Sequence, residues 1–140
     1  MIIKGIPKAQ KRHRHTNRGI VYDPSAVDKK EYIKQLQFLK PDKPHNSPIS
    51  LKVVFVMPYP KKYYRSGKYS HILKHNAPKL HAVKPDIDNL IKFLLDVLQD
   101  AEWIKDDSII TNISAQKVYG QTAHTHFIIS QETLTNGEHD

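Results

Sequence analysis

The clearest alternation of apolar and polar positions along the chain runs from residue 49 to residue 57. Its alternate residues are large and apolar: Ile49, Leu51, Val53, Phe55 and Met57. A period of two, with many β-branched residues, is typical of a β-strand with one buried face. Because Pro58 and Pro60 follow at once, we predict a strand over residues 49–57.

A second apolar run begins just after Pro85 and has a helical period. Asp86 stands where an N-cap is favoured, and Asp88 stands in the first turn, where the helix dipole favours negative charge. On a helical wheel the apolar residues cover roughly 200°: Ile87, Leu90, Ile91, Phe93, Leu94, Leu95, Val97 and Leu98. Asp88 and Lys92 are neighbours on the polar strip. We predict a deeply buried helix whose polar strip begins with carboxylates and a lysine, although the carboxylates could simply be its cap.

Weaker patterns predict the remaining elements. We expect a strand over residues 2–6, and a helix from Ala26 to about Leu39, capped by Ser25, whose apolar stripe is Val27, Tyr32, Ile33, Leu36 and Leu39. Trp103 should seal the end of the buried helix, and residues 109–119 and 123–130 should pair as an antiparallel hairpin around Gly120. These elements predict a single α+β domain over residues 1–130, with a small mixed or antiparallel sheet packed against two or more helices. Residues 131–140 are predicted to be a polar C-terminal tail.

The composition favours a protein that stays away from membranes. The chain of 140 residues has no cysteine, which fits a reducing compartment. No apolar run approaches the roughly 20 residues of a membrane span, and the first residues are not those of a signal peptide. We therefore expect a cytoplasmic protein.

The net charge of +8 is unevenly distributed. Six basic residues and no acid precede Asp23, and nine more without an acid lie between Lys43 and Pro85. From Asp86 to Asp107 the balance inverts, with seven acids and two bases. A basic protein with one acidic island is suited to holding a polyanion and a cation at one place. The alternative is a surface whose charge only maintains solubility.

Two basic segments are candidates for contact with a nucleic acid backbone. Residues 8–19 have no apolar period and should form a loop, and residues 61–79 interleave tyrosines with lysines, a composition that can clamp a backbone and stack on exposed bases. The candidate DNA-binding residues are Lys8, Lys11, Arg12, Arg14, Arg18, Lys61, Lys62, Arg65, Lys68 and Lys84. His71 and His75 have helical spacing but no evident third ligand, so we expect surface residues rather than a zinc site.

The run Lys-Pro-Asp-Ile-Asp-Asn-Leu-Ile-Lys over residues 84–92, with Asp106-Asp107 some way downstream, resembles the RusA family of Holliday junction resolvases. Residues 81–84 and the segment from Pro7 to Pro24 also resemble phage-borne members. The similarity extends from about Pro7 to Gly120, but residues 61–79 match nothing that can be aligned. Asp-x-Asp alone is a weak motif, whereas the composite is specific.

The resemblance implies a magnesium-dependent endonuclease that works as a homodimer on branched DNA, with an α+β fold and a role in phage DNA processing, recombination or repair. It implies that Asp86, Asp88 and Asp107 are essential carboxylates that bind Mg²⁺, with Mn²⁺ as a substitute. Lys92 would be the essential basic neighbour, and Asp106 and Asn89 would assist.

The chemistry of these residue types agrees with that implication. Magnesium prefers oxygen ligands and keeps several waters, so a few carboxylates suffice. The bound ion can polarise a scissile phosphate and generate hydroxide. For the three carboxylates to meet, the loop carrying Asp106 and Asp107 must fold back to the start of the buried helix, which capping alone does not require.

Three functions remain open at this point. The first is an endonuclease that resolves Holliday junctions by paired cuts; the second is a nuclease with broader structure or flap selectivity; the third is a basic nucleic-acid-binding protein without catalysis. A homodimer is expected because the apolar arc of the buried helix is about twice the stripe of a surface helix. The alternative is that the chain's own strands cover this arc.

Overall fold

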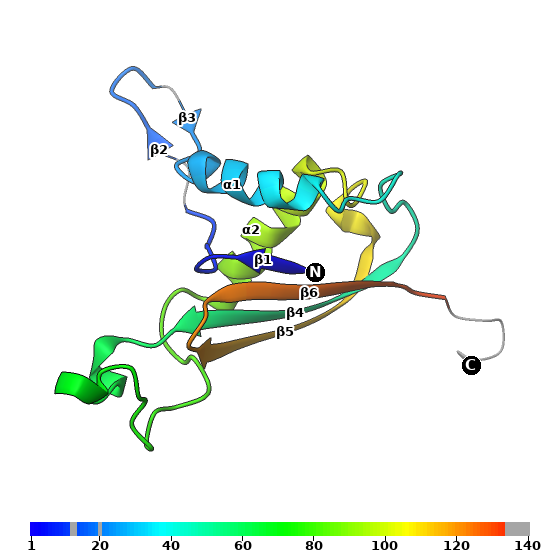
Figure 1. The fold of residues 1–140 in the computed structure, drawn as a ribbon. Coiled ribbons are helices and arrows are strands. Elements are labelled where there is room, and N and C mark those ends of the chain that lie inside the picture. The colour runs from blue at the N-terminus through cyan, green and yellow to red at the C-terminus, as the bar shows by residue number, and fades with distance from the viewer. Residues whose placement is uncertain (12–13, 20, 134–140) are drawn as a thin grey trace.

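A computed structural model describes residues 1–11, 14–19 and 21–133. Two helices lie on the same face of a four-stranded mixed sheet (Figure 1), which confirms the predicted α+β class. The elements are β1 (Ile2–Lys4), β2 (Arg14–His15), β3 (Val21–Tyr22), α1 (Ala26–Gln37), β4 (Ile49–Pro58), η1 (Lys61–Tyr63), η2 (Gly67–Tyr69), α2 (Ile87–Asp100), η3 (Asp107–Ile109), β5 (Ile110–Gly120) and β6 (His124–Gln131). No helix in these ranges has the length and apolar content needed to cross a membrane.

The core forms between β4 and α2, the two elements with the strongest sequence patterns. The alternate residues of β4 from Ile49 to Met57 are all buried, as the alternation predicts. The buried side of α2 consists of Leu90, Phe93, Leu94, Val97 and Leu98. At the end of this helix, the Trp103 indole packs edge-on against Phe127 and donates to the Leu36 carbonyl at 2.9 Å. Both strong predictions, and the sealing role of Trp103, are therefore confirmed.

The predicted hairpin between β5 and β6 is wrong, although both strands exist. The order of the sheet is β1-β6-β4-β5, so β4 lies between them. β5 runs parallel to β4 and β6 runs antiparallel to it. The most apolar strand thus occupies a position where both of its edges are paired, and the short connection after β5 crosses beyond the end of β4. A short connection normally indicates a hairpin, and nothing local in the sequence reveals this crossing.

Gly120 permits the close crossing. A Cβ atom added at this position would lie 2.4 Å from Cγ1 of Val56 on β4. Val56 cannot turn aside easily because its β-branched side chain is restricted at χ1. We expect Gly120→Ala to lower the free energy of unfolding by about 1–3 kcal/mol, the usual cost of overpacking, measured by urea denaturation. In a Val56→Ala background, Gly120→Ala should lower the free energy of unfolding by less than it does in the wild type, because the clashing methyl group is gone. An equal loss in both backgrounds would contradict the clash.

Four weaker predictions are corrected by the structure. α1 ends at Gln37, and its buried residues are Tyr32 and Leu36, whereas Val27 and Leu39 are exposed. Ser25 is at the N-cap but makes no capping bond; its hydroxyl accepts from the Lys11 backbone N–H instead. Residues 14–15, which lie within the expected loop, pair with residues 21–22 as the small β2–β3 sheet. The first strand is shorter than predicted, Ile2–Lys4.

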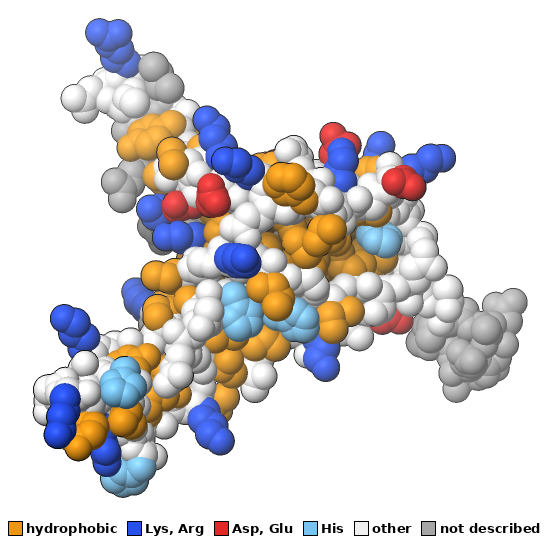
Figure 2. Space-filling model, viewed as in Figure 1, with side chains coloured by type: hydrophobic (Ala, Val, Ile, Leu, Met, Phe, Trp, Pro, Cys, Tyr) orange, Lys and Arg blue, Asp and Glu red, His pale blue; other side chains and the backbone are white. Residues whose placement is uncertain are grey.

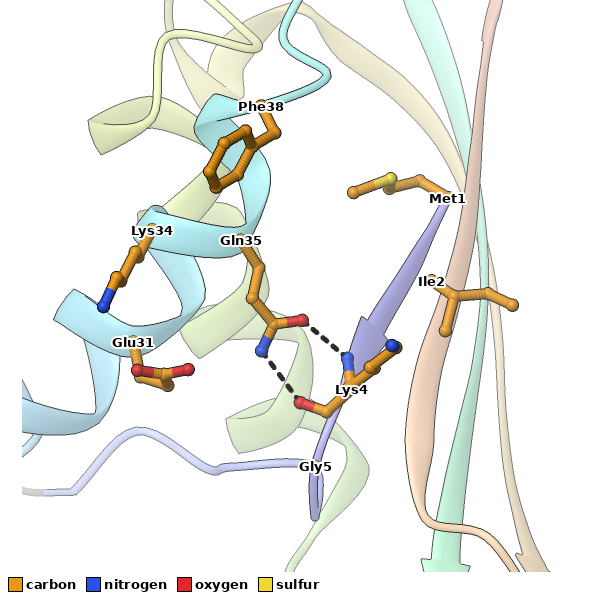
Figure 3. Close-up of a pocket in the computed structure, with 8 residues that line it drawn as sticks. All are labelled: Met1, Ile2, Lys4, Gly5, Glu31, Lys34, Gln35 and Phe38. Carbon is orange, nitrogen blue, oxygen red and sulfur yellow. Dashed lines mark hydrogen bonds between the residues drawn. The ribbon is translucent and has the colours of Figure 1, made fainter.

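The first strand is fixed to α1 by one side chain. The Gln35 amide accepts from the Lys4 N–H at 2.8 Å and donates to the Lys4 carbonyl at 3.0 Å (Figure 3). This pair of bonds occupies backbone groups that the edge strand β1 would otherwise leave open. The neighbouring hollow is lined mainly by β1 and α1, and Glu31 is the one carboxylate in its lining (Figure 3). It is therefore a poor candidate for a cation site.

Candidate metal and DNA site at the start of α2

Asp86 and Asp88 line one open pocket at the N-terminal end of α2. Asp86 occupies the N-cap position with an extended backbone, yet its side chain makes no capping hydrogen bond. Asp88 is exposed, and its Oδ1 accepts from the neighbouring Asn89 N–H at 2.9 Å. The Asp86 carboxylate therefore does not cap the helix. The interpretation that these carboxylates serve only as a helix cap lacks the side-chain hydrogen bond that it requires.

Lys92 follows Asp88 by one turn and its side chain is exposed. None of the ion pairs formed within the described part of the chain involves Asp86, Asp88 or Lys92. Two carboxylates and a lysine one turn further along the helix, none of them engaged in an ion pair with a described residue, are free to contact a cation and a phosphate.

Two further side chains in this pocket were not identified from the sequence. Lys117 reaches it from β5, where its Nζ donates to the carbonyls of Val83 and Pro85, both at 2.7 Å. These bonds hold the segment that leads into α2, including the cis Lys84–Pro85 peptide. In the sequence, Lys117 could be recognised from the alternation along the strand. It lies two residues from both Ala115 and Tyr119, so its side chain is on the same face of the strand as theirs, which pack against the core. A lysine on the inward face of a strand needs a specific partner.

His81 is the second unexpected residue. It is 7% exposed, its ring packs edge-on against Tyr119 at 4.8 Å between centroids, and its Nδ1 has no hydrogen-bond partner among the described residues. Burial, together with the nearby Lys117 ammonium, lowers the pKa of His81 below its usual value. The lowered pKa favours the neutral form of the ring, so His81 is not a source of positive charge that the pocket depends on.

Asp107 lies at the other end of α2. Its backbone N–H donates to Oε1 of Gln99 at 3.1 Å. Gln99 comes eleven residues after Asp88, a separation of about 16 Å along a helix axis. Among the described residues no three His, Cys, Asp or Glu side chains are grouped closely enough to hold a metal ion. The prediction that Asp107 folds back to Asp86 and Asp88 within one chain is therefore wrong, because β5 begins beside the C-terminal end of α2.

The two assisting candidates have structural contacts. The Asp106 side chain caps η3 by accepting from the Ser108 N–H at 3.1 Å. Hydrogen bonding from the Ser108 side chain, and then from this N–H, lowers the pKa of Asp106. The Asn89 carbonyl accepts from the Gln10 N–H at 3.0 Å. That second contact attaches the basic N-terminal segment to the first turn of α2.

The Asp23 carboxylate, which forms a salt bridge with Lys29, also holds Gln10 of the same N-terminal segment. Asp23 accepts from Lys29 at 2.6 Å and from the Gln10 amide at 3.1 Å. The hydrogen bond from Lys29 is the main reason that the pKa of Asp23 falls to about 2. The carboxylate therefore stays ionised, and the bridge stays intact, at neutral pH.

The basic segments lie on two projections beyond the end of the sheet where α2 begins. One projection carries β2 and β3, and the other carries η1 and η2 (Figure 1). Lys and Arg side chains are visible on both (Figure 2). The exposed candidates are Lys8, Lys11, Arg18, Lys61, Lys62, Arg65, Lys68 and Lys84. Arg12 and the side chain of Arg14 lie outside the part of the chain that the structure describes. His71 and His75 are exposed, as expected.

Comparison with known proteins identifies a family and a relative. The family described as Endodeoxyribonuclease RusA matches residues 3–130. The chain is also similar to the uncharacterized protein YqaN of Bacillus subtilis (strain 168), with 29% identity over 137 residues, which cover 92% of this chain and 93% of that protein.

Proposed function

Because the chain belongs to the RusA family of endodeoxyribonucleases, we propose that it is a metal-dependent endonuclease that resolves Holliday junctions as a homodimer. The observation that supports this most strongly is the pocket at the start of α2. Asp86 and Asp88 line it and form no ion pair with any residue that the structure describes, and basic projections extend beyond the same end of the sheet. A carboxylate pair beside a DNA-facing basic surface is an arrangement suited to phosphodiester hydrolysis.

The donors fit a hard divalent cation. Asp86 and Asp88 would hold Mg²⁺, or Mn²⁺ as a substitute, through carboxylate oxygens. The ion supplies Lewis acidity and a hydroxide nucleophile when bound. The Lys92 ammonium would contact the phosphate and stabilise the charge that develops on its oxygens. Lys117 would keep the approach to α2 in place by holding the carbonyls of Val83 and Pro85.

The position of Asp107 supports an assembly of two chains. Ile87, Ile91 and Leu95 form a half-exposed apolar stripe on α2. This stripe runs beside Asp88 at one end and Gln99, the partner of Asp107, at the other. Two copies of α2 that pack antiparallel along this stripe would bring the partner subunit's Asp107 towards Asp88. Each site would then contain Asp86, Asp88 and Lys92 of one chain and the partner's Asp107.

A two-fold dimer also suits the substrate. Resolving a four-way junction requires two cuts related by symmetry, and a C2 dimer supplies two equivalent sites. The Ile113 side chain on the edge strand β5 is 40% exposed on the face that α2 packs against. It adds to the apolar surface available between the copies.

The direct test is cleavage of a synthetic four-way junction with Mg²⁺, with Mn²⁺ and with EDTA. We expect paired cuts with either metal and none with EDTA. Flaps, forks and linear duplex serve as comparison substrates. Faster cleavage of flaps than of junctions would favour the broader structure-selective nuclease, and absence of cleavage on every substrate with both metals would contradict the proposal.

The N-terminal basic segment should contribute to binding through phosphate contacts. Replacing both Lys8 and Lys11 with Ala should weaken junction binding and flatten its dependence on salt, because each lost phosphate contact removes about 0.9 from the slope of log K against log salt. The control is Lys34→Ala with Lys52→Ala, two exposed lysines outside the basic segments. Both slopes are measured by binding titrations at roughly 50 to 200 mM salt, a range over which phosphate contacts strongly change the affinity. Equal slopes for the two double variants would remove this segment from the interface.

A further inference from the structure

The segment from residue 59 to residue 80, here called the aromatic arm, is a folded projection rather than a loose loop. Tyr64 and Leu73 form an antiparallel bridge. The Arg65 N–H donates to the Ile72 carbonyl, and the Lys74 N–H donates to the Tyr63 carbonyl, both at 2.8 Å. These bonds close a hairpin whose tip is residues 65–72.

The base of the aromatic arm is attached to the sheet beside the candidate site. The Tyr59 ring stacks on Tyr119 of β5 with 4.8 Å between centroids, and the Tyr59 hydroxyl donates to the Pro78 carbonyl at 2.6 Å. The Tyr119 ring also packs against His81, which lines the pocket of Asp86 and Asp88. The same cluster therefore connects the arm to the wall of the pocket, and the tip is held in a defined place relative to it.

The tip presents an aromatic ring and positive charge to solvent. Every residue from Arg65 to Ile72 is exposed, and Tyr69 itself is 46% exposed. The Arg65 guanidinium and the Lys68 ammonium lie 5.9 and 5.3 Å from the centroid of the Tyr69 ring. The arm contains six basic residues and no acidic one: Lys61, Lys62, Arg65, Lys68, Lys74 and Lys79.

We propose that the tip of the aromatic arm binds unpaired bases at the branch point of the DNA, with Tyr69 stacking on a base and with Arg65 and Lys68 contacting the flanking phosphates. This inference rests on the proposed function, and it gives the arm the role of distinguishing branched DNA from duplex.

The combination of an exposed aromatic ring with neighbouring cations is the reason for proposing an unpaired nucleotide as the ligand. A surface that only follows a duplex backbone needs cations and gains nothing from an exposed ring, because the base faces of a duplex are stacked inside it. A nucleotide at a branch point can expose both a flat base and a phosphate a few ångströms away. Stacking on an aromatic side chain tolerates any base, so the tip would recognise the absence of pairing and not a sequence.

The test compares Tyr69→Ala with Tyr69→Phe, which keeps the stacking face, and with Phe38→Ala, which removes an exposed ring just after the C-terminal end of α1. Each variant is titrated in EDTA against a four-way junction with 2-aminopurine beside the branch point, a matched linear duplex and an oligo-dT strand. Tyr69 is exposed, so thermal melting should show all three variants folded.

We expect Tyr69→Ala to weaken binding to the junction and to oligo-dT about tenfold, to leave duplex binding within about twofold, and to abolish the change in 2-aminopurine fluorescence. Tyr69→Phe and Phe38→Ala should behave as the wild type. Equal losses on junction and duplex, or no loss on either, would overturn the inference.

The two proposals can fail separately. A wild-type protein that cuts junctions, with Tyr69→Ala binding them equally well, overturns the role of the aromatic arm and keeps the nuclease. A wild-type protein that cuts no substrate with Mg²⁺ or Mn²⁺, yet binds oligo-dT through Tyr69, overturns the nuclease and keeps the base-binding tip.

Discussion

Replacing Asp88 with Asn is expected to abolish junction cleavage while leaving junction binding equal to or tighter than that of the wild type. The substitution removes a carboxylate that would hold the cation, and it also removes a negative charge that faces the phosphates. Loss of a group that only supports a metal ligand typically costs about 10- to 100-fold, so loss of the ligand should cost at least about a hundredfold. Single-turnover cleavage with Mg²⁺, alongside binding in EDTA, measures both effects.

Asp96→Asn is the matched control. Asp96 lies on the polar strip of the same helix, two turns after Asp88, and its nearest basic partner is Lys29 at 3.4 Å. This change removes the same charge from the same helix without altering the pocket, and cleavage should stay near the wild-type rate. A fully active Asp88→Asn variant would show that the carboxylate does not act in the reaction.

A dimer in which one chain carries Asp88→Asn and the other carries Asp107→Asn is expected to nick the junction at about half the wild-type rate per dimer, although either homodimeric variant is inactive. If each site combines Asp86 and Asp88 of one chain with the partner's Asp107, both substitutions fall in the same site. The second site is then intact. The two variants are purified together through different tags, and nicking of a junction is followed on a denaturing gel.

This complementation separates an intersubunit site from a site within one chain. With all three carboxylates supplied in cis, each chain of the mixed dimer would carry one defect, and no nicking would occur. The arrangement with α2 packed against α2 would then be wrong, and Asp107 would need some other route to Asp88. The single-chain geometry argues against such a route, because Asp107 is fixed beside Gln99.

Some features of this protein follow from the sequence alone because they depend on residues close together in the chain. The alternation from Ile49 to Met57 and the apolar arc after Pro85 predict β4 and α2 correctly. The spacing of Asp86, Asp88 and Lys92 follows from the helix itself. The family resemblance rests on this same local run, and the family match over residues 3–130 agrees with it.

The tertiary structure decided what depends on which strands become neighbours. Because β4 lies between β5 and β6, β5 runs parallel to β4 and passes α2 from its C-terminal end to its N-terminal end. That one choice brings Lys117 to the mouth of the pocket and leaves Asp107 beside Gln99. The physical reason is that strand pairing depends on burying both edges of the most apolar strand, a requirement of the whole sheet that no short stretch of sequence contains.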